Sequence, residues 1–367
     1  MKDYEAVLKQ VAGRMMHMKQ DGIQEKYPVS LLDMEAWEWP QGVGLYGLYK
    51  YYKNTGDPGT LEFLTGWYDR RMEEGPREHN INTTAPMLTL TFLYEITGRP
   101  SYLDEIKKWA RWMMEDKGLI RTGDGLFQHM ITGDPNEDEI LIDTLFMAVY
   151  FLARAGILLH RQDYVEEAHF QILQHIKYLL NKQEGLFFHG FNFKRNDNYG
   201  EVLWGRGNCW YTIVLMDYLE TVPVGEGLKR YFLSVYQNQA QALKRYADPE
   251  TGLWHTVLNN PETYLELSAS AGFLAGIMHG VRNGYLSCEA YGPVIEKALS
   301  HLEDYIAGDG TVLQVSYGTP VGLDEAFYKN IPCYPMTYGQ AMMILALQEA
   351  MAFEGDAGRI HQMPAIH

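Results

Sequence analysis

Six stretches of the chain are apolar on nearly every side of a helix, and they recur along its length. They are rich in Gly, Ala, Leu and Met. Helices of this composition lie inside a protein, because none of their faces is suited to water. The pattern therefore predicts six inner helices, over residues 40–52, 84–97, 143–155, 207–220, 268–281 and 337–350.

Longer amphipathic stretches alternate with the apolar ones. In one of them Tyr102, Ile106 and Trp109 fall on one face, while Asp104 and Lys107 fall on the other. A period of about 3.6 residues is typical of helices with one side in water. The pattern predicts six outer helices, over residues 3–19, 58–73, 101–116, 162–182, 227–247 and 289–307.

The segments that lead from an outer to an inner helix share a second pattern. Each contains a glycine, then apolar residues and then a polar residue, as in Gly125-Leu126-Phe127-Gln128-His129. Such a pattern favours a short β-like finger. We expect fingers at residues 125–129, 185–189, 252–255 and 310–314.

The alternation of helices predicts an all-α fold, an (α/α)6 barrel with short β-like fingers in the outer-to-inner loops. One hairpin cannot bury its apolar helix alone, and closing the ring solves this. The competing architecture is an open α-solenoid, which the irregular repeat length and the long aromatic connections disfavour. No composition shift marks a domain boundary, so we expect a single domain over residues 1–355 and a tail over residues 356–367.

Composition removes several classes of protein. The chain has 367 residues, of which 46% are hydrophobic, too many for a disordered chain and enough for a large core. It has 31 Lys and Arg residues against 47 Asp and Glu residues, a net charge of −16. Nucleic acids and anionic membranes attract basic surfaces, so we expect neither as a partner.

Cysteines and apolar runs bear on the compartment. Cys209, Cys288 and Cys333 are odd in number and far apart, which disfavours a disulfide scaffold. The first residues lack the apolar run of a signal peptide, and no run of about 18 apolar residues occurs. We therefore expect a cytoplasmic protein without a membrane-spanning helix.

Candidate chemistry gathers in the long outer-to-inner segments and at the starts of the inner helices. These lie at one end of such a ring, and long loops on a rigid scaffold are where sites are built. Tryptophans suit stacking on sugar rings, and an arginine between glycines suits a carboxylate. The candidates are Trp39, Asn82, His129, His189, Trp204, Arg206 and Trp210. The structural alternatives are a core plug for Trp39, a helix cap for Asn82 and an ion pair for Arg206.

Asp143 is the candidate for proton transfer. It opens the third predicted inner helix and has apolar neighbours on both sides. A helix start lowers the pKa of a carboxyl group, whereas an apolar setting and a nearby anion raise it. A carboxylic acid held in this balance can donate a proton near neutrality. The alternative is a capping role, for which aspartate is well suited.

Cofactor motifs are missing from the sequence. His255 and His279 are isolated, and neither an HExxH run nor a pair of closely spaced cysteines occurs, so we expect no metal. No glycine-rich nucleotide-binding motif follows a predicted strand, so we expect no cofactor.

Six runs of residues, spread over most of the chain, occur in the order of a known family. They are Trp39-Pro40-Gln41-Gly42, Asn82-Thr83-Thr84-Ala85-Pro86, Phe127-Gln128-His129, Asp143-Thr144-Leu145-Phe146-Met147-Ala148, Trp204-Gly205-Arg206-Gly207-Asn208 with Trp210, and Ser316-Tyr317-Gly318-Thr319. Together they resemble the unsaturated rhamnogalacturonyl hydrolases of glycoside hydrolase family 105, which are related to the unsaturated glucuronyl hydrolases of family 88. The family fold is an (α/α)6 barrel, which the helix pattern predicts independently.

The resemblance implies a substrate and a reaction. The substrate would be a small anionic oligosaccharide, made by a pectin or rhamnogalacturonan lyase, that ends in an unsaturated uronic acid such as galacturonyl. Asp143 would protonate C4 of its C4=C5 double bond as the general acid and base, and water would add at C5. The resemblance also gives the residues that would shape the pocket, His129, His189, Trp204, Arg206 and Trp210. One departure is Asn192, where the family often carries an aspartate.

Two other functions fit parts of the pattern. A sugar 2-epimerase of the same architecture would use paired histidines as proton shuttles, and His129 with His189 makes this possible. Asp143 would then have no role. A noncatalytic carbohydrate-binding toroid would keep the tryptophans and would not need Asp143 either.

Overall fold

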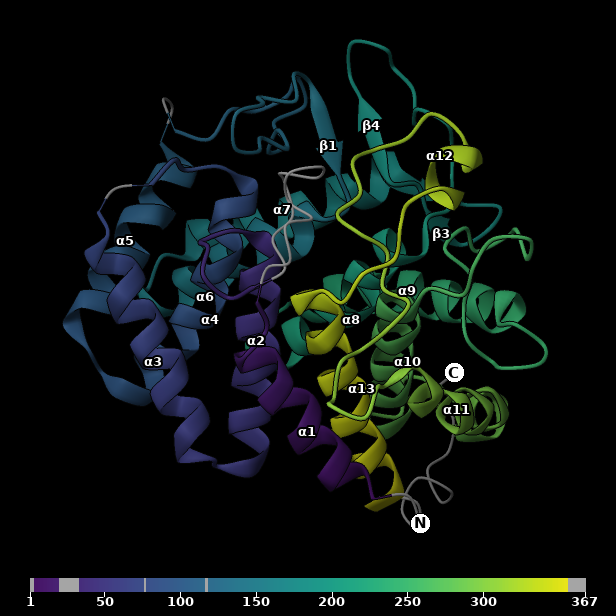
Figure 1. Ribbon diagram of the computed structural model, residues 1–367. Coiled ribbons are helices and arrows are strands. Elements are labelled where there is room, and N and C mark those ends of the chain that lie inside the picture. Colours follow the sequence, from purple (N-terminus) through teal and green to yellow (C-terminus); the bar gives the residue numbers. More distant parts are fainter. Residues whose placement is uncertain (1–2, 20–32, 76, 116–117, 356–367) are drawn as a thin grey trace.

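The computed structural model describes residues 3–19, 33–75, 77–115 and 118–355, and its helices alternate between an inner and an outer layer (Figure 1). The inner helices are α2 (Trp39–Thr55), α4 (Ile81–Thr97), η2 (Leu145–Val149) continued by α6 (Tyr150–Leu158), α8 (Gly205–Thr221), α10 (Leu267–Arg282) and α13 (Thr337–Gly355). The outer helices are α1 (Tyr4–Met16), α3 (Pro58–Glu73), α5 (Pro100–Met114), α7 (Gln162–Leu179), α9 (Glu226–Tyr246) and α11 (Cys288–Leu302), which continues into η3 (Glu303–Tyr305). A short helix, α12 (Glu325–Lys329), lies in the loop before α13.

The inner helices close into a ring. α2 packs against α4, α4 against η2 and α6, these two against α8, α8 against α10, and α10 against α13, which returns to α2. A closed ring leaves no apolar helix face open at either end of the array. The predicted (α/α)6 barrel is therefore confirmed, and the open α-solenoid is wrong.

Each outer helix covers the inner helix that precedes it in the chain, and the first helix covers the last. α3 packs on α2, α7 on α6, α9 on α8 and α11 on α10, while α1 packs on α13. Gln340 in α13 fixes this closure, because its Nε2 donates to the backbone oxygens of Val11 and Gly310 at 3.1 and 2.9 Å. The two ends of the described chain thus complete the barrel together.

Small residues let the inner helices approach each other closely. A Cβ atom on Gly47 would lie 2.8 Å from the Cα of Ala341 in α13, and one on Gly276 would lie 2.9 Å from the carbonyl oxygen of Thr212 in α8. Real Cβ atoms do not approach other atoms this closely, so both positions require glycine. This packing explains why the inner segments are rich in Gly and Ala.

The four predicted fingers are present as tight antiparallel turns. β2 (Leu180–Asn181) and β3 (Leu186–Phe187) form the second finger, and isolated bridges close the first and the fourth. The third is closed by the backbone hydrogen bond from the Asp248 N–H to the Leu253 oxygen at 2.8 Å. All four turns contain a glycine with φ between 73° and 86°, a region where other residues are strained. These glycines are Gly125, Gly185, Gly252 and Gly310.

Two features around the third inner helix were not expected. β1 (Glu139–Leu141) pairs antiparallel with β4 (Gly190–Asn192), which joins the loops of the first two fingers. The helix itself begins with the π-helical turn η2 instead of an α-helical turn. Such wide turns are often found at functional sites.

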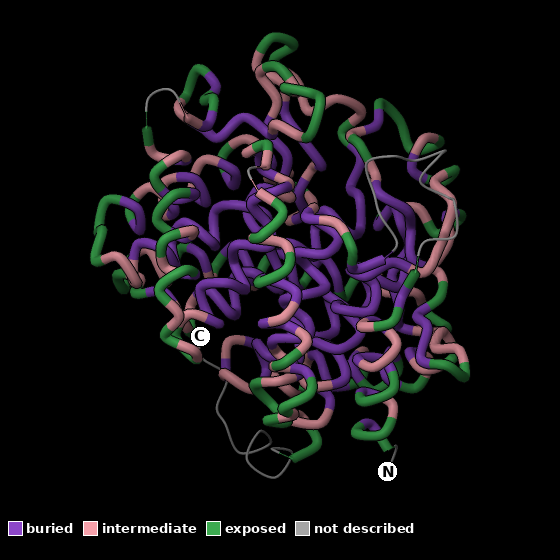
Figure 2. Tube along the Cα trace, turned by 60° about the vertical axis from the view of Figure 1, so that its left-hand side comes forward, coloured by how far each residue is buried: buried purple, intermediate pink, exposed green. Residues whose placement is uncertain are grey.

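Burial follows the layered design. Figure 2 shows the buried residues in the centre of the molecule and the exposed ones at its periphery. One cluster of buried apolar side chains runs from Tyr4 to Ala350. The predicted tail over residues 356–367 lies outside the described residues, and the single domain over residues 1–355 stays a prediction. Within the described ranges, no helix is long and apolar enough to cross a membrane.

Candidate active site

A cavity of about 240 Å³ opens at the end of the barrel where the inner helices begin. This is the end that carries β1, β4 and α12 in Figure 1. The long outer-to-inner segments meet there, as predicted. Six predicted site residues line the cavity, namely Trp39, Asn82, His129, Asp143, Trp204 and Arg206.

Asp143 lies in the turn between β1 and η2. Its backbone oxygen accepts hydrogen bonds from the backbone N–H groups of Phe146 and Met147, both at 3.0 Å, so its main chain starts the helix. Its side chain is 15% exposed. The carboxyl oxygen Oδ2 has no hydrogen-bond partner within the described part of the chain. A capping bond from this oxygen is therefore absent there, and Oδ2 remains available for other chemistry.

The surroundings of Asp143 favour its protonated form. Burial raises the pKa of this carboxyl group to about 6, and the nearby Arg206 guanidinium opposes the rise. The Trp210 side chain also favours the charged form, although its Nε1 makes no hydrogen bond within the described residues. A carboxyl group with such a pKa can both donate and accept a proton near neutrality.

His189 stands beside Asp143. It lies in the turn between β3 and β4, and its Nε2 is 3.6 Å from Asp143 Oδ2. Its ring packs against Trp204 at a tilt of 38°, with 4.1 Å between the centroids. Burial lowers the pKa of His189 well below its usual value, so the ring is neutral at physiological pH.

His129 approaches the same corner from the first finger. Its Nδ1 is 2.8 Å from the Thr144 hydroxyl, one residue beyond Asp143. Burial lowers the pKa of His129 to about 3. Both site histidines are therefore neutral hydrogen-bonding groups and contribute no positive charge to the cavity.

Among the described residues that line the cavity, Arg206 is the cation, and it has a second task. The side chain is 1% exposed, and its guanidinium donates to the Tyr317 oxygen at 3.1 Å and the Thr319 hydroxyl at 2.9 Å. It also donates to Ser316. Arg206 therefore anchors the loop over residues 316–319, which forms one wall of the cavity. Its charge acts across the cavity at the same time.

Glu266 balances Arg206 from the start of α10. This carboxylate is fully buried, lies 3.9 Å from the Arg206 guanidinium, and accepts from the backbone N–H groups of Ala269 and Ser316 at 2.7 and 2.8 Å. Tyr338, at the start of α13, carries Arg206 over its ring at 4.8 Å. These contacts fix the guanidinium in one orientation.

The remaining predicted residues fall into two groups. Trp39 stacks on Tyr338 at 4.7 Å and lines the cavity. Asn82 lines the cavity as well. The predicted capping role falls to Asn80, which is the N-cap residue of α4. Trp210 lies below the cavity wall and packs on Phe146 in η2, with 5.2 Å between the ring centroids.

Asn192, the departure from the family pattern, has a local structural task. Its Oδ1 accepts from the backbone N–H groups of Lys194 and Arg195 at 3.1 and 3.0 Å. Its Nδ2 donates to the Glu137 oxygen and the Tyr199 hydroxyl at 3.3 and 3.2 Å. A carboxylate could accept the first two bonds but could not donate the others. Asn192 does not line the cavity.

Three side chains around the site were missed by sequence reasoning, Glu266, Tyr338 and Tyr328. The positions of Glu266 and Tyr338 in the sequence could have identified them. Trp39, Asn82 and Arg206 all stand in the first turn of an inner helix, as Tyr338 does in α13, and Glu266 is the N-cap residue of α10. Tyr328 lies in the short helix α12, which no periodic pattern in the sequence predicts. Across the described residues, no cluster of three or more His, Cys, Asp or Glu side chains is arranged to hold a metal ion.

Comparisons with known proteins point to one enzyme class. The model of Glycosyl Hydrolase Family 88 matches residues 7–353. The chain is 30% identical over 319 residues to the unsaturated rhamnogalacturonyl hydrolase YesR of Bacillus subtilis (strain 168), which covers 86% of this chain and 90% of that protein. A crystal structure of a possible GH105 family member from Salmonella enterica has a TM-score of 0.89 at 40% identity, over 95% of this chain and 94% of that one. The unsaturated glucuronyl hydrolase of Bacillus sp. GL1 shares the fold, with a TM-score of 0.69 at 17% identity over 95% and 96% of the two chains.

The fold, the cavity and these matches define a glycoside hydrolase built on an (α/α)6 barrel. The chain belongs to glycosyl hydrolase family 88, and its solved relatives include members of family 105. The resemblance that the sequence motifs carry is thereby confirmed. The chain is an enzyme of this class, and neither the sugar 2-epimerase nor the noncatalytic toroid describes it.

Proposed function

We propose that this enzyme removes the terminal 4,5-unsaturated uronic acid, in the galacturonyl form, from lyase-generated pectin or rhamnogalacturonan oligosaccharides. The observation that carries the proposal is the Asp143 carboxyl group, whose pKa burial raises to about 6 and which lines the cavity with Oδ2 unpaired. The names of the relatives support the substrate class, since they describe unsaturated rhamnogalacturonyl, rhamnoglycuronyl and glucuronyl hydrolases.

The reaction begins at the double bond and not at the anomeric carbon. Asp143 donates its proton to C4, and water adds at C5 as the resulting carboxylate takes up a proton from it. The C5 hemiketal opens to a ketone and leaves a hemiacetal at C1. This hemiacetal collapses to an aldehyde and expels the rest of the oligosaccharide as an alcohol. Asp143 ends protonated, so one carboxyl group suffices, unlike the usual flanking pair.

Charge explains how an anionic substrate binds to a chain of net charge −16. Arg206 lines the cavity, and its hydrogen bonds to Tyr317 and Thr319 already hold the guanidinium in place before a substrate binds. The uronate is attracted by this local charge. A bound carboxylate near Asp143 also raises the pKa of Asp143 further, which keeps the acid protonated.

The test uses an unsaturated rhamnogalacturonan disaccharide and the ultraviolet absorbance of its conjugated double bond. We expect the absorbance to decay with the wild-type enzyme and at least about a hundredfold more slowly with Asp143→Asn, the scale of a lost general acid. Asp197→Asn, an exposed aspartate in the turn after β4, is the matched control and should retain full activity. Full activity in Asp143→Asn would overturn the role of Asp143. A faster decay with a glucuronyl disaccharide would overturn the galacturonyl preference.

A further inference from the structure

Two buried polar atoms face each other across the site without a conventional hydrogen bond. They are Asp143 Oδ2 and His189 Nε2, 3.6 Å apart. Neither has a hydrogen-bond partner in the described ranges of the chain. Unpaired buried polar atoms are costly, and hydrogen bonds at active sites are often long until substrate binds. Which of the two atoms carries the hydrogen decides how the acid can act.

The other side of the His189 ring provides the answer. Its Nδ1 lies 2.8 Å from the hydroxyl of Tyr328 in α12. That hydroxyl already accepts a hydrogen bond from the backbone N–H of Gly322 at 2.9 Å. Tyr328 is 1% exposed, so its own O–H needs an acceptor inside the protein, and Nδ1 is the atom within reach. Tyr328 therefore donates to Nδ1.

This direction fixes the tautomer of His189. A neutral imidazole carries one hydrogen, and when Nδ1 accepts, the hydrogen is on Nε2. The ring itself cannot move far, because the His189 backbone oxygen accepts from the Ile142 N–H at 3.0 Å and the ring packs on Trp204. Nε2–H then points at Asp143 Oδ2. Because a donor faces it, Oδ2 accepts this hydrogen and does not carry the acid proton.

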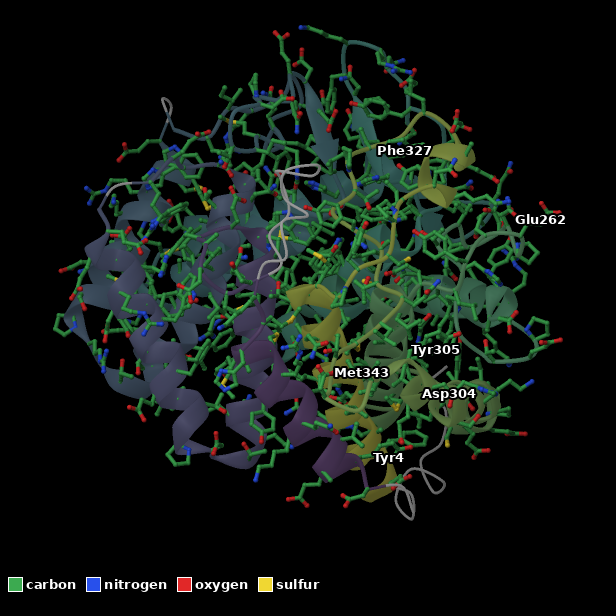
Figure 3. All side chains as sticks on the ribbon, in the orientation of Figure 1. Tyr4, Glu262, Asp304, Tyr305, Phe327 and Met343 are labelled. Carbon is green, nitrogen blue, oxygen red and sulfur yellow. The ribbon has the colours of Figure 1, made fainter. Side chains whose placement is uncertain are left out.

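We propose that Tyr328 is a positioning residue that, through the Nε2–H tautomer of His189, keeps Asp143 Oδ2 as an acceptor and the acid proton on Oδ1. The inference rests on the proposed function, in which Asp143 supplies that proton. It assigns a role to the segment that carries α12, whose position at the cavity end is marked by Phe327 in Figure 3. Trp204, Val202 and Val257 pack with Tyr328 in a small apolar cluster that holds this segment in place.

Removing the Tyr328 hydroxyl should allow His189 to adopt either tautomer. In Tyr328→Phe, Nδ1 loses its donor, and the hydrogen can move to Nδ1 so that Nε2 becomes an acceptor. The acid proton can then sit on Oδ2, and the loss of the Nε2–H donor raises the pKa of Asp143. Among the described residues that line the cavity, the other ionisable groups are unchanged, and they are His129, Asp134, Glu139 and Arg206.

The first measurement needs no substrate. In protein with isotope-labelled histidine, the ring-nitrogen chemical shifts distinguish the two tautomers, and the His189 signals are assigned by their absence in His189→Gln. We expect a protonated Nε2 and a bare Nδ1 in the wild type, and loss of this pattern in Tyr328→Phe. A protonated Nδ1 in the wild type would overturn the inference even if Tyr328→Phe failed to fold.

The second measurement is the pH profile of kcat on the unsaturated disaccharide. We expect Tyr328→Phe to lower kcat about tenfold with KM unchanged, the scale of one hydrogen bond to a charged group, and to move the basic limb to higher pH. Tyr236→Phe, which removes a buried hydroxyl bonded to Gly276 O at 2.7 Å, controls for a general loss of stability and should leave both unchanged.

A double-mutant cycle separates positioning from support of the loop. The side-chain amide of His189→Gln can donate to Asp143 without a tautomer, so Tyr328→Phe should have no further effect on kcat in that background. Additive effects would show that Tyr328 acts by another route. An inactive wild type would instead overturn the proposed function, while the tautomer measurement would still decide the inference.

Discussion

At the scale of single residues, the surroundings of Asp143 serve its chemistry but lower the stability of the folded protein. Burial raises the pKa of its carboxyl group from 3.8 to about 6. The charged form is therefore less favourable in the folded chain than in the unfolded chain. Because the folded pKa is the higher one, the protein loses stability as the pH rises from about 4 to 6 and does not regain it above.

Asp143→Asn should accordingly stabilise the enzyme while it abolishes activity. At pH 7.5 we expect the variant to gain on the order of 3 kcal/mol, because about two pKa units of unfavourable ionisation are removed. At pH 4, where the folded wild type is protonated, the two proteins should unfold alike. Chemical denaturation at both pH values measures this. Asp197→Asn, at an exposed site where the pKa of the carboxyl group is lowered, should show no such gain. Equal stability of Asp143→Asn and wild type at pH 7.5 would contradict the burial argument.

At the scale of the elements, local chemistry explains what could be predicted from the sequence. The predicted helix over residues 58–73 matches α3 at both ends, because Asp57 caps it and Pro58 fixes its first turn. The fingers were predictable for the same reason, because each turn needs a residue with positive φ and glycine adopts this conformation without strain. Asp143 and Arg206 were found because both stand out at the start of an apolar segment.

What could not be predicted depends on contacts between distant segments. The pairing of β1 with β4 and the π-helical start of the third inner helix arise where two finger loops meet. Tyr328 lies 139 residues beyond His189, and neither the period nor the composition of its segment links the two. Arg206 was predicted as a ligand for substrate, but its hydrogen bonds to Ser316, Tyr317 and Thr319 depend on tertiary packing.

The finger glycines offer a matched test at this scale. Gly125 has φ of 83°, and a Cβ atom there would make only ordinary contacts, so Gly125→Ala isolates the backbone strain. We expect a loss of about 1 kcal/mol in the free energy of unfolding. Gly123 lies in the same finger and has no positive φ, and a Cβ atom added to it would meet no other atom within 4 Å. Gly123→Ala should therefore be neutral or slightly stabilising. Equal effects of the two variants in denaturant titrations would count against the predicted finger.

At the scale of the whole molecule, the two ends of the barrel differ in charge chemistry. The opening holds neutral histidines beside the buried Arg206–Glu266 pair, whereas the histidine at the far end is itself paired with an acid. There Lys50 bonds Asp217 at 2.7 Å, and His279 Nε2 bonds Glu220 at 2.5 Å. The inner helices end here, and helix C-termini favour cations. Burial opposes a charge on His279, but Glu220, Glu349 and Asp217 together raise its pKa, and His279 lowers the pKa of Glu220 to about 2.

His279 should therefore stabilise the barrel most in acid. Its folded pKa lies above 6.5, so its contribution is fully present below that pH and is lost as the pH rises through the folded pKa. We expect His279→Gln to cost about 1–2 kcal/mol at pH 6 and clearly less at pH 9. His301→Gln, which removes an exposed pair with Asp304, should change little at either pH. A cost in His279→Gln that does not vary with pH, measured by denaturant unfolding, would refute the linkage.

The central claim is that Asp143 protonates the double bond and that this bond is hydrated before the glycosidic bond is lost. The most direct measurement follows, in one reaction, the loss of double-bond absorbance and the appearance of the released sugar, with wild type and with Asp143→Asn. We predict that the absorbance falls no later than the sugar appears in the wild type, and that both rates drop at least about a hundredfold in Asp143→Asn. Release of the sugar ahead of the absorbance change, or an undiminished rate in Asp143→Asn, would contradict the claim.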